Sequence, residues 1–251
     1  MPDQPAERTP PIQQSRRFLR SQWRQWRQRL AFWVGALLVG LAALAFAWLA
    51  DKSFALFQRM LGVCSYLPLI VSPLGFAALA WVTQRWFGNA KGSGIPQVIA
   101  ALESPSRAFR AQVLALPVAF IRMLFTLGAL LVGGSVGREG PTVHVGAAVL
   151  YAFGTRLGLH SRRAASGLIL AGGAAGIAAA FNTPLAGVVF AIEELSRTFE
   201  QRFSGLVLTA VLIGGVVTLG LMGHYAYFGD IGGGLPTGWG WSEVPACAVL
   251  G

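Results

Sequence analysis

Charged side chains are scarce in this sequence. Asp, Glu, Lys and Arg together make up 12% of its 251 residues, whereas hydrophobic residues make up 54%. Soluble domains carry about twice that share of charge. The surplus of apolar surface has to face lipid rather than water, which excludes an ordinary soluble domain. The sequence therefore predicts a multi-pass integral membrane protein.

Cysteine is also nearly absent. The chain has two cysteines, Cys64 and Cys247, which lie far apart in or beside apolar sequence. This excludes a disulfide framework and a thiolate metal site, so we interpret both as unreactive packing residues. The sequence shows neither a metal-ligand cluster nor a nucleophile–base pair. It therefore predicts no enzyme, no metal and no cofactor.

Positive charge is present, but it is concentrated before the first apolar run. Residues 1–29 contain seven arginines, and the positive-inside rule then places the N-terminus in the cytoplasm. Trp23 and Trp26 lie among these arginines, which favours an interfacial helix over nucleic-acid binding. We predict a cytoplasmic basic segment over 1–29, disordered to residue 15 and helical from residue 16. The membrane domain follows over 30–251.

Long apolar runs predict the membrane spans. A bilayer core about 30 Å thick needs about 20 apolar residues per helix. Runs of about that length lie at 30–50, 64–84, 111–133 and 204–223. Two pieces are too short to cross, at 95–102 and 141–155. Residues 225–242 read as a Gly- and aromatic-rich loop, and 245–251 as the opening of another helix.

The run Ala164–Ile192 is too long for one span. It holds 29 residues without a charge, about 43 Å as one straight helix. Pro184 disfavours helix at the residue before it, so Asn182-Thr183-Pro184 breaks the run. We predict one helix of about 18 residues and a shorter one over 184–196, entering and leaving by the same side. The glycines of 172–176 predict close helix packing rather than a phosphate loop.

Helices broken at membrane depth are typical of transport sites, because non-helical backbone there has to line protein or a polar cavity. The segment Gly92–Pro96 (GSGIP) places Ser93 beside free backbone N–H groups at a helix start, which suits a dehydrated anion. An ordinary Ser N-cap is the plainer reading. On spacing alone, that plainer reading is favoured.

The segment Gly137–Pro141 (GREGP) puts an arginine and a glutamate inside apolar sequence. Ionisable residues at depth point to function. Pro141 opens a helix, so Glu139 lies where the helix dipole favours a carboxylate, and an anion is favoured there for the same reason. Glu139 can therefore compete with a permeating anion and, when protonated, leave. The alternative is a structural bridge between Arg138 and Glu139.

The glutamate pair after Pro184 and the histidine after Pro141 each allow more than one interpretation. Glu193 and Glu194 end the short helix after Pro184 and point about 100° apart. One can face the interior as a proton relay, or both can be solvated carboxylates. His144 is interpreted as a hydrogen-bonded core residue rather than a ligand.

Together, GSGIP at 92–96, GREGPTV at 137–143 and FNTPLAG at 181–187 followed by Glu193 and Glu194 resemble the CLC chloride channel and transporter family. The three motifs occur in the family's order and approximate spacing. The resemblance implies an all-α membrane fold, the first inverted repeat of the CLC fold, built from short, broken, tilted helices.

The resemblance also implies the site residues. Glu139 matches the external gating glutamate, and Glu194 the internal proton-transfer glutamate. The implied chloride-binding residues are Ser93, Gly94, Ile95, Arg138, Glu139 and Gly140. The implied structural neighbours are Glu193, Pro96 and Pro141.

The family's chloride/proton antiporters typically carry an acid at the internal position, so Glu194 favours chloride/proton antiport over a passive channel. Implied partners are chloride, protons, lipid and a second copy packed through about 184–220, with no nucleic acid. The implied location is a bacterial inner membrane. Because only the first of two inverted halves is recognisable, a non-transporting scaffold or partial subunit is a third reading.

Overall fold

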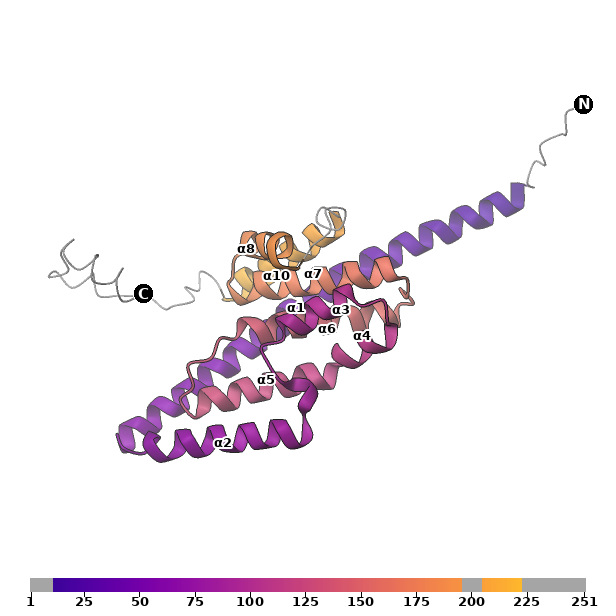
Figure 1. Ribbon diagram of the computed structural model, residues 1–251. Helices are drawn as coiled ribbons and strands as arrows, with labels where there is room; N and C mark the ends of the chain where they lie inside the picture. Colours follow the sequence, from indigo (N-terminus) through magenta and orange to yellow (C-terminus); the bar gives the residue numbers. More distant parts are fainter. Residues whose placement is uncertain (1–10, 196–204, 223–251) are drawn as a thin grey trace, which may run out of the picture.

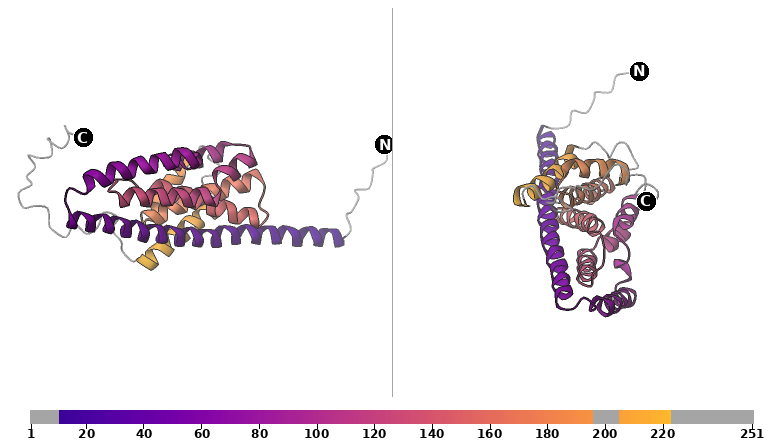
Figure 2. Two further views of the ribbon diagram at one scale, coloured as in Figure 1. Left: turned by 90° about the horizontal axis from the view of Figure 1, so that it is seen from below. Right: turned by 90° about the vertical axis from the view of Figure 1, so that its left-hand side faces the viewer.

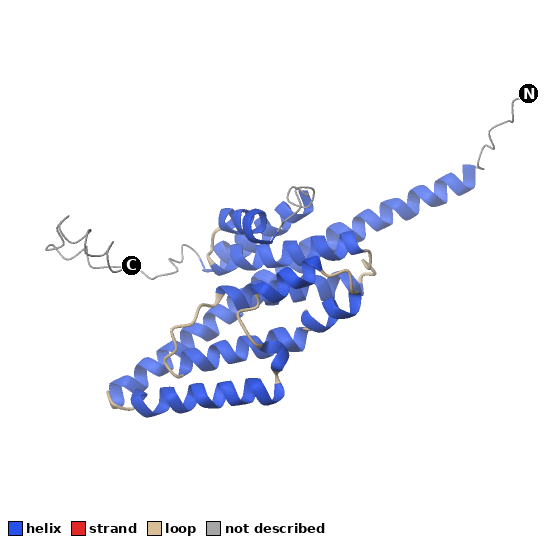
Figure 3. Cartoon of the chain, viewed as in Figure 1, coloured by secondary structure: helices blue, strands red, loops and turns tan. Residues whose placement is uncertain are grey.

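A computed structural model describes residues 11–195 and 205–222. Within those residues all regular structure is helical, which confirms the predicted all-α class (Figure 3). The predicted loop at 225–242 and the helix opening at 245–251 lie outside the described residues, as does Cys247. By length and composition, three described helical segments can cross a membrane: Gln25–Val63, Arg107–Leu131 and Arg162–Ala180.

The first helix is longer than predicted. Helix α1 runs without interruption over Pro11–Val63, 53 residues, and extends well beyond the other helices at its N-terminal end (Figure 2). Residues 11–15 are therefore helical, against the predicted disorder, and the predicted surface helix over 16–29 was wrong as a separate element because it continues into the predicted span over 30–50. Residues 1–10 lie outside the described residues. No proline lies between Pro11 and Pro68, so Asp51 and Lys52 add charge without breaking the backbone hydrogen bonds.

The predicted span at 64–84 is helix α2 (Pro68–Trp86). It is not among the three segments that qualify as spans by length and composition, and it contains no buried residue. Cys64 lies at the turn between α1 and α2 and is exposed. Its interpretation as a packing cysteine was wrong, because an apolar neighbourhood in sequence does not bury a residue at a turn.

The predicted span at 111–133 is two helices. Helix α4 covers Arg107–Val113 and helix α5 covers Leu116–Leu131. Ala115 between them is extended, and Pro117 lies in the first turn of α5. Proline disfavours helix at the residue before it and suits a first turn, so Pro117 starts a helix here instead of bending one.

The remaining elements follow the predictions closely. A short 3-10 turn, η1 (Gly88–Ala90), precedes helix α3 (Ile95–Glu103). The later α-helices are α6 (Glu139–Arg156), α7 (Arg162–Ala180), α8 (Pro184–Phe190) and α10 (Gly205–Met222). A π-helical turn, η2 (Ala191–Leu195), directly follows α8. The predicted break after α7 is confirmed, with Asn182 at φ +54°.

Helices α6 and α7 form the centre of the bundle. Helix α1 crosses one side of them, and α8 and α10 lie along α7 (Figure 1). A Cβ built on Gly172 would lie 2.7 Å from the backbone carbon of Gly146 and 2.9 Å from the Cα of Ala147. The two backbones therefore touch, which confirms that the glycines of 172–176 serve close helix packing.

Candidate functional site

The starts of α3 and α6 are in contact. Gly94 is the N-cap of α3 and has φ +110°, a conformation that side chains rarely adopt. A Cβ on Gly94 would lie 2.9 Å from the carbonyl oxygen of Gly140, and one on Gly140 would lie 2.6 Å from the carbonyl oxygen of Ser93. Only glycine fits at both positions, so the structure brings the two predicted motifs into direct contact.

The residues at the two helix starts differ in their exposure to solvent. Gly94, Gly140 and Pro141 are buried, Ile95 is half-buried, and Ser93 and Pro96 are exposed. Helix N-termini carry partial positive charge and unpaired N–H groups. The exposed Ser93 hydroxyl therefore lies at the edge of a region where two such termini converge. This is an arrangement that can bind an anion.

Glu139 is the first residue of α6 and is half-buried. A Cβ built on Gly137 would overlap Oε2 of Glu139, which shows that the Glu139 carboxylate folds back over the preceding loop. A side chain at that point would collide with the carboxylate, and glycine leaves the space free. The negative side chain thus occupies the start of the helix, as expected from the helix dipole.

Arg138 forms an ion pair with a residue outside the GREGP segment. Its Nη1 lies 3.3 Å from Oδ1 of Asp51 on α1. The side chain of Arg138 is 12% exposed and that of Asp51 is 52% exposed. Sequence reasoning missed Asp51, which lies 87 residues away. The guanidinium of Arg138 ties the loop before α6 to α1.

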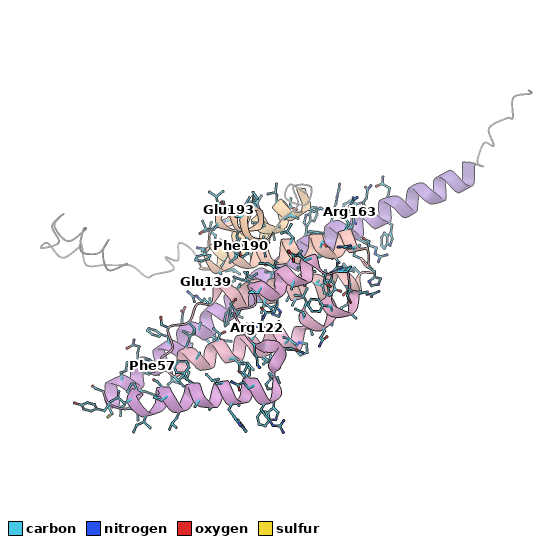
Figure 4. The ribbon with its side chains drawn as sticks, viewed as in Figure 1. Phe57, Arg122, Glu139, Arg163, Phe190 and Glu193 are labelled. Carbon is cyan, nitrogen blue, oxygen red and sulfur yellow. The ribbon has the colours of Figure 1, made fainter. Side chains whose placement is uncertain are left out.

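A groove opens beside Glu139. Its volume is about 650 Å³. It is lined by Ile95, Glu139, Ile177, Phe181, Thr183, Leu185, Ala186, Val189, Phe190 and Glu193. Figure 4 shows Glu139, Phe190 and Glu193 on this side of the molecule. The walls are mostly apolar, and the two carboxylates are the ionisable groups in the lining.

The two glutamates of η2, which directly follows α8, are both exposed. Glu193 lines the groove, whereas Glu194 is not among the lining residues. The structure therefore brings Glu193, predicted as a structural neighbour, onto the same groove as Glu139. Because both side chains are exposed, the proton relay and the pair of solvated carboxylates both stay open as predictions.

Two buried side chains lie behind the α3 start. His144 is fully buried, and its Nε2 lies 3.0 Å from the carbonyl oxygen of Val113, which confirms its interpretation as a hydrogen-bonded core residue. Arg122 on α5 is 2% exposed. The only sequence signal for Arg122 was a cation within an apolar run.

The broken helices, the converging helix starts and the apolar surface define an integral membrane protein of the broken-helix class. The family model described as voltage gated chloride channel matches residues 74–251. The chain belongs to this family. Family membership confirms the resemblance that the three motifs indicated.

Among solved structures, the chain is similar to a slow cyanobacterial Cl⁻/H⁺ antiporter. The similarity has a TM-score of 0.64 and 27% sequence identity, and it covers 80% of this chain. The chain spans about half the length of that protein, 48%. The match confirms the predicted CLC-type fold for the part of the chain that it covers.

Proposed function

We propose that this chain forms the first half of a chloride transporter that exchanges chloride for protons. The observation that carries the proposal is the contact between the starts of α3 and α6, with Glu139 at the second start. The antiporter named above supports it, as an exchanger with a similar fold. Chloride binds at Ser93, Gly94, Ile95, Glu139 and Gly140, with Arg138 holding the loop.

The mechanism follows from competition for one positive region. When ionised, the Glu139 carboxylate fills the start of α6. Protonation removes its charge, the side chain leaves, and chloride takes its place. Glu194 supplies protons from the internal side. Glu193, on the groove with Glu139, precedes Glu194 in η2.

Proton-coupled chloride flux in liposomes tests this assignment. The protein is reconstituted with a complementing second half of the fold, and chloride and proton movement are recorded together. Glu139→Gln should give chloride flux without proton flux, because a neutral side chain neither competes nor carries a proton. Glu194→Val should likewise abolish proton movement while chloride still moves. Proton flux that persists in Glu194→Val would remove Glu194 from the proton path, whereas chloride flux without proton flux in the unsubstituted protein would favour a passive channel.

A chloride-binding measurement distinguishes a partial subunit of the transporter from a non-transporting scaffold. Calorimetry measures chloride binding to the 251-residue chain alone and with the second half. Binding only after the second half is added assigns the chain to a partial subunit of the transporter. Absence of binding in both samples favours a scaffold.

We also propose a homodimer through about 184–220, in a bacterial inner membrane with the N-terminus cytoplasmic. The exposed side chains of Leu212, Val216 and Leu219 on α10 support the dimer, because their spacing places them on one helix face. Light scattering in detergent tests the oligomeric state. A monomer at all protein concentrations would contradict the dimer.

A further inference from the structure

Two buried arginines hold the two ends of α3. Arg110 is 3% exposed and Arg122 is 2% exposed. Arg110 donates from Nε to the carbonyl oxygen of Ala101 at 3.1 Å and from Nη2 to that of Ser104 at 2.5 Å. A cation at the C-terminal carbonyls of a helix is favoured by the helix dipole. The position of Arg110 is thus accounted for by its own contacts.

Arg122 lies at the opposite, positive end of α3. Its Nη2 donates to the carbonyl oxygens of Asn89 at 3.2 Å and Lys91 at 3.1 Å. Its Nη1 lies directly behind Gly94, 2.7 Å from where a Cβ would be. Here the helix dipole opposes a cation rather than favouring it. The two carbonyls hold the side chain in place but supply no negative charge.

Part of the Arg122 guanidinium has no partner. Within the described residues, its Nε and Nη1 are buried without a hydrogen-bond partner. Groups beside the same loop include the side chain of His144 and the carbonyl of Gly140 near Gly94, and the side chain of Gln97, which donates to the carbonyl oxygen of Lys91. A buried cation that is incompletely compensated is costly. A negative charge at the adjoining α3 and α6 starts would offset that cost.

We propose that Arg122 sets the affinity of the anion site. Its guanidinium holds the loop from Asn89 to Gly94 and adds a fixed positive charge behind the point where the two helix starts meet. This role rests on the proposed binding of chloride at that point. The anion recognised is small and singly charged, and Arg122 acts on it through the field rather than through direct contact.

The test compares chloride dissociation constants, measured by calorimetry in lipid nanodiscs with the complementing second half. Arg122→Met should weaken chloride binding roughly tenfold or more, because a charge within several ångströms acts through a medium of low dielectric constant. Arg122→Lys keeps the charge and should stay within about threefold of the unsubstituted protein. Arg110→Met removes a matched buried arginine and should leave affinity within about twofold, while lowering stability.

Each outcome decides the question. Unchanged affinity in Arg122→Met overturns the proposal. Equal losses in Arg122→Lys and Arg122→Met assign Arg122 to holding the loop and overturn its electrostatic role. Should Arg122→Met fail to fold, Arg122→Gln takes its place, and equal affinity of the Lys and Gln variants overturns the proposal. Absence of chloride binding in the unsubstituted protein refutes the proposed function instead.

Discussion

A methyl group added at Gly140 would collide with Ser93. A Cβ at Gly140 would lie 2.6 Å from the carbonyl oxygen of Ser93, 2.9 Å from its Cβ and 3.1 Å from its carbonyl carbon. Ordinary van der Waals contact begins at 3.4 Å. In Gly140→Ala, the Ser93 backbone therefore has to move by about 0.8 Å at the closest atom.

This displacement has two measurable effects. Alanine in a helix gains about 0.5–1 kcal/mol over glycine, but overpacking costs about 1–3 kcal/mol, so unfolding should become easier by about 1–2 kcal/mol. Ser93 is the proposed chloride ligand, and a hydrogen bond to a charged group contributes about 1.5–3 kcal/mol. Losing about half of it should weaken chloride binding by about fourfold to tenfold.

Calorimetry and thermal unfolding of the reconstituted protein measure both effects. Gly167→Ala is the matched control, since the nearest atom to a Cβ there is Cζ of Phe32 at 3.6 Å. That variant should be slightly stabilised, by up to about 1 kcal/mol, with unchanged chloride affinity. Wild-type affinity in Gly140→Ala would refute the contact between Ser93 and α6, or the role of Ser93 in binding.

Two further substitutions test the scaffold around the site. Gly172→Leu should destabilise the protein by about 3 kcal/mol or more, because the backbone of Gly146 cannot yield as a flexible side chain would; an unchanged unfolding temperature would show that α6 and α7 do not touch. Asp51→Asn should cost about 1 kcal/mol or less, since its carboxylate is half-exposed beside Arg138; a loss above about 2 kcal/mol in thermal unfolding would contradict a weak ion pair.

The helix starts were predictable from the sequence because proline marks them locally. Pro96, Pro117, Pro141 and Pro184 all lie in the first turn of a helix. A missing N–H costs nothing at that position, and the fixed φ angle suits the helix. Pro117 also marks a helix start, but it lies inside an apolar run that hydropathy predicts as one span, so the break between α4 and α5 was not predicted.

The contacts between distant residues were not predictable. Asp51 and Arg138 are 87 positions apart, and the place of Arg122 depends on how α5 packs beneath the loop at Asn89–Gly94. In a helix that is apolar nearly all round, hydropathy does not say which face meets protein and which meets lipid. The long helix α1 shows the same limit, because charge at Asp51 marks a change of surroundings and not a change of backbone.

The charges at the site bear on the proposal that one glutamate acts as both gate and proton carrier. The starts of α3 and α6 contribute positive potential, and a buried guanidinium at Arg122 adds to it. One negative charge offsets this excess, whether it is the carboxylate of Glu139 or a chloride ion. Two negative charges repel each other, and with none the buried cation stays uncompensated. In the proposed function, protonating Glu139 therefore favours chloride entry, and chloride departure favours an ionised Glu139, so the charge at the helix starts would couple the two fluxes.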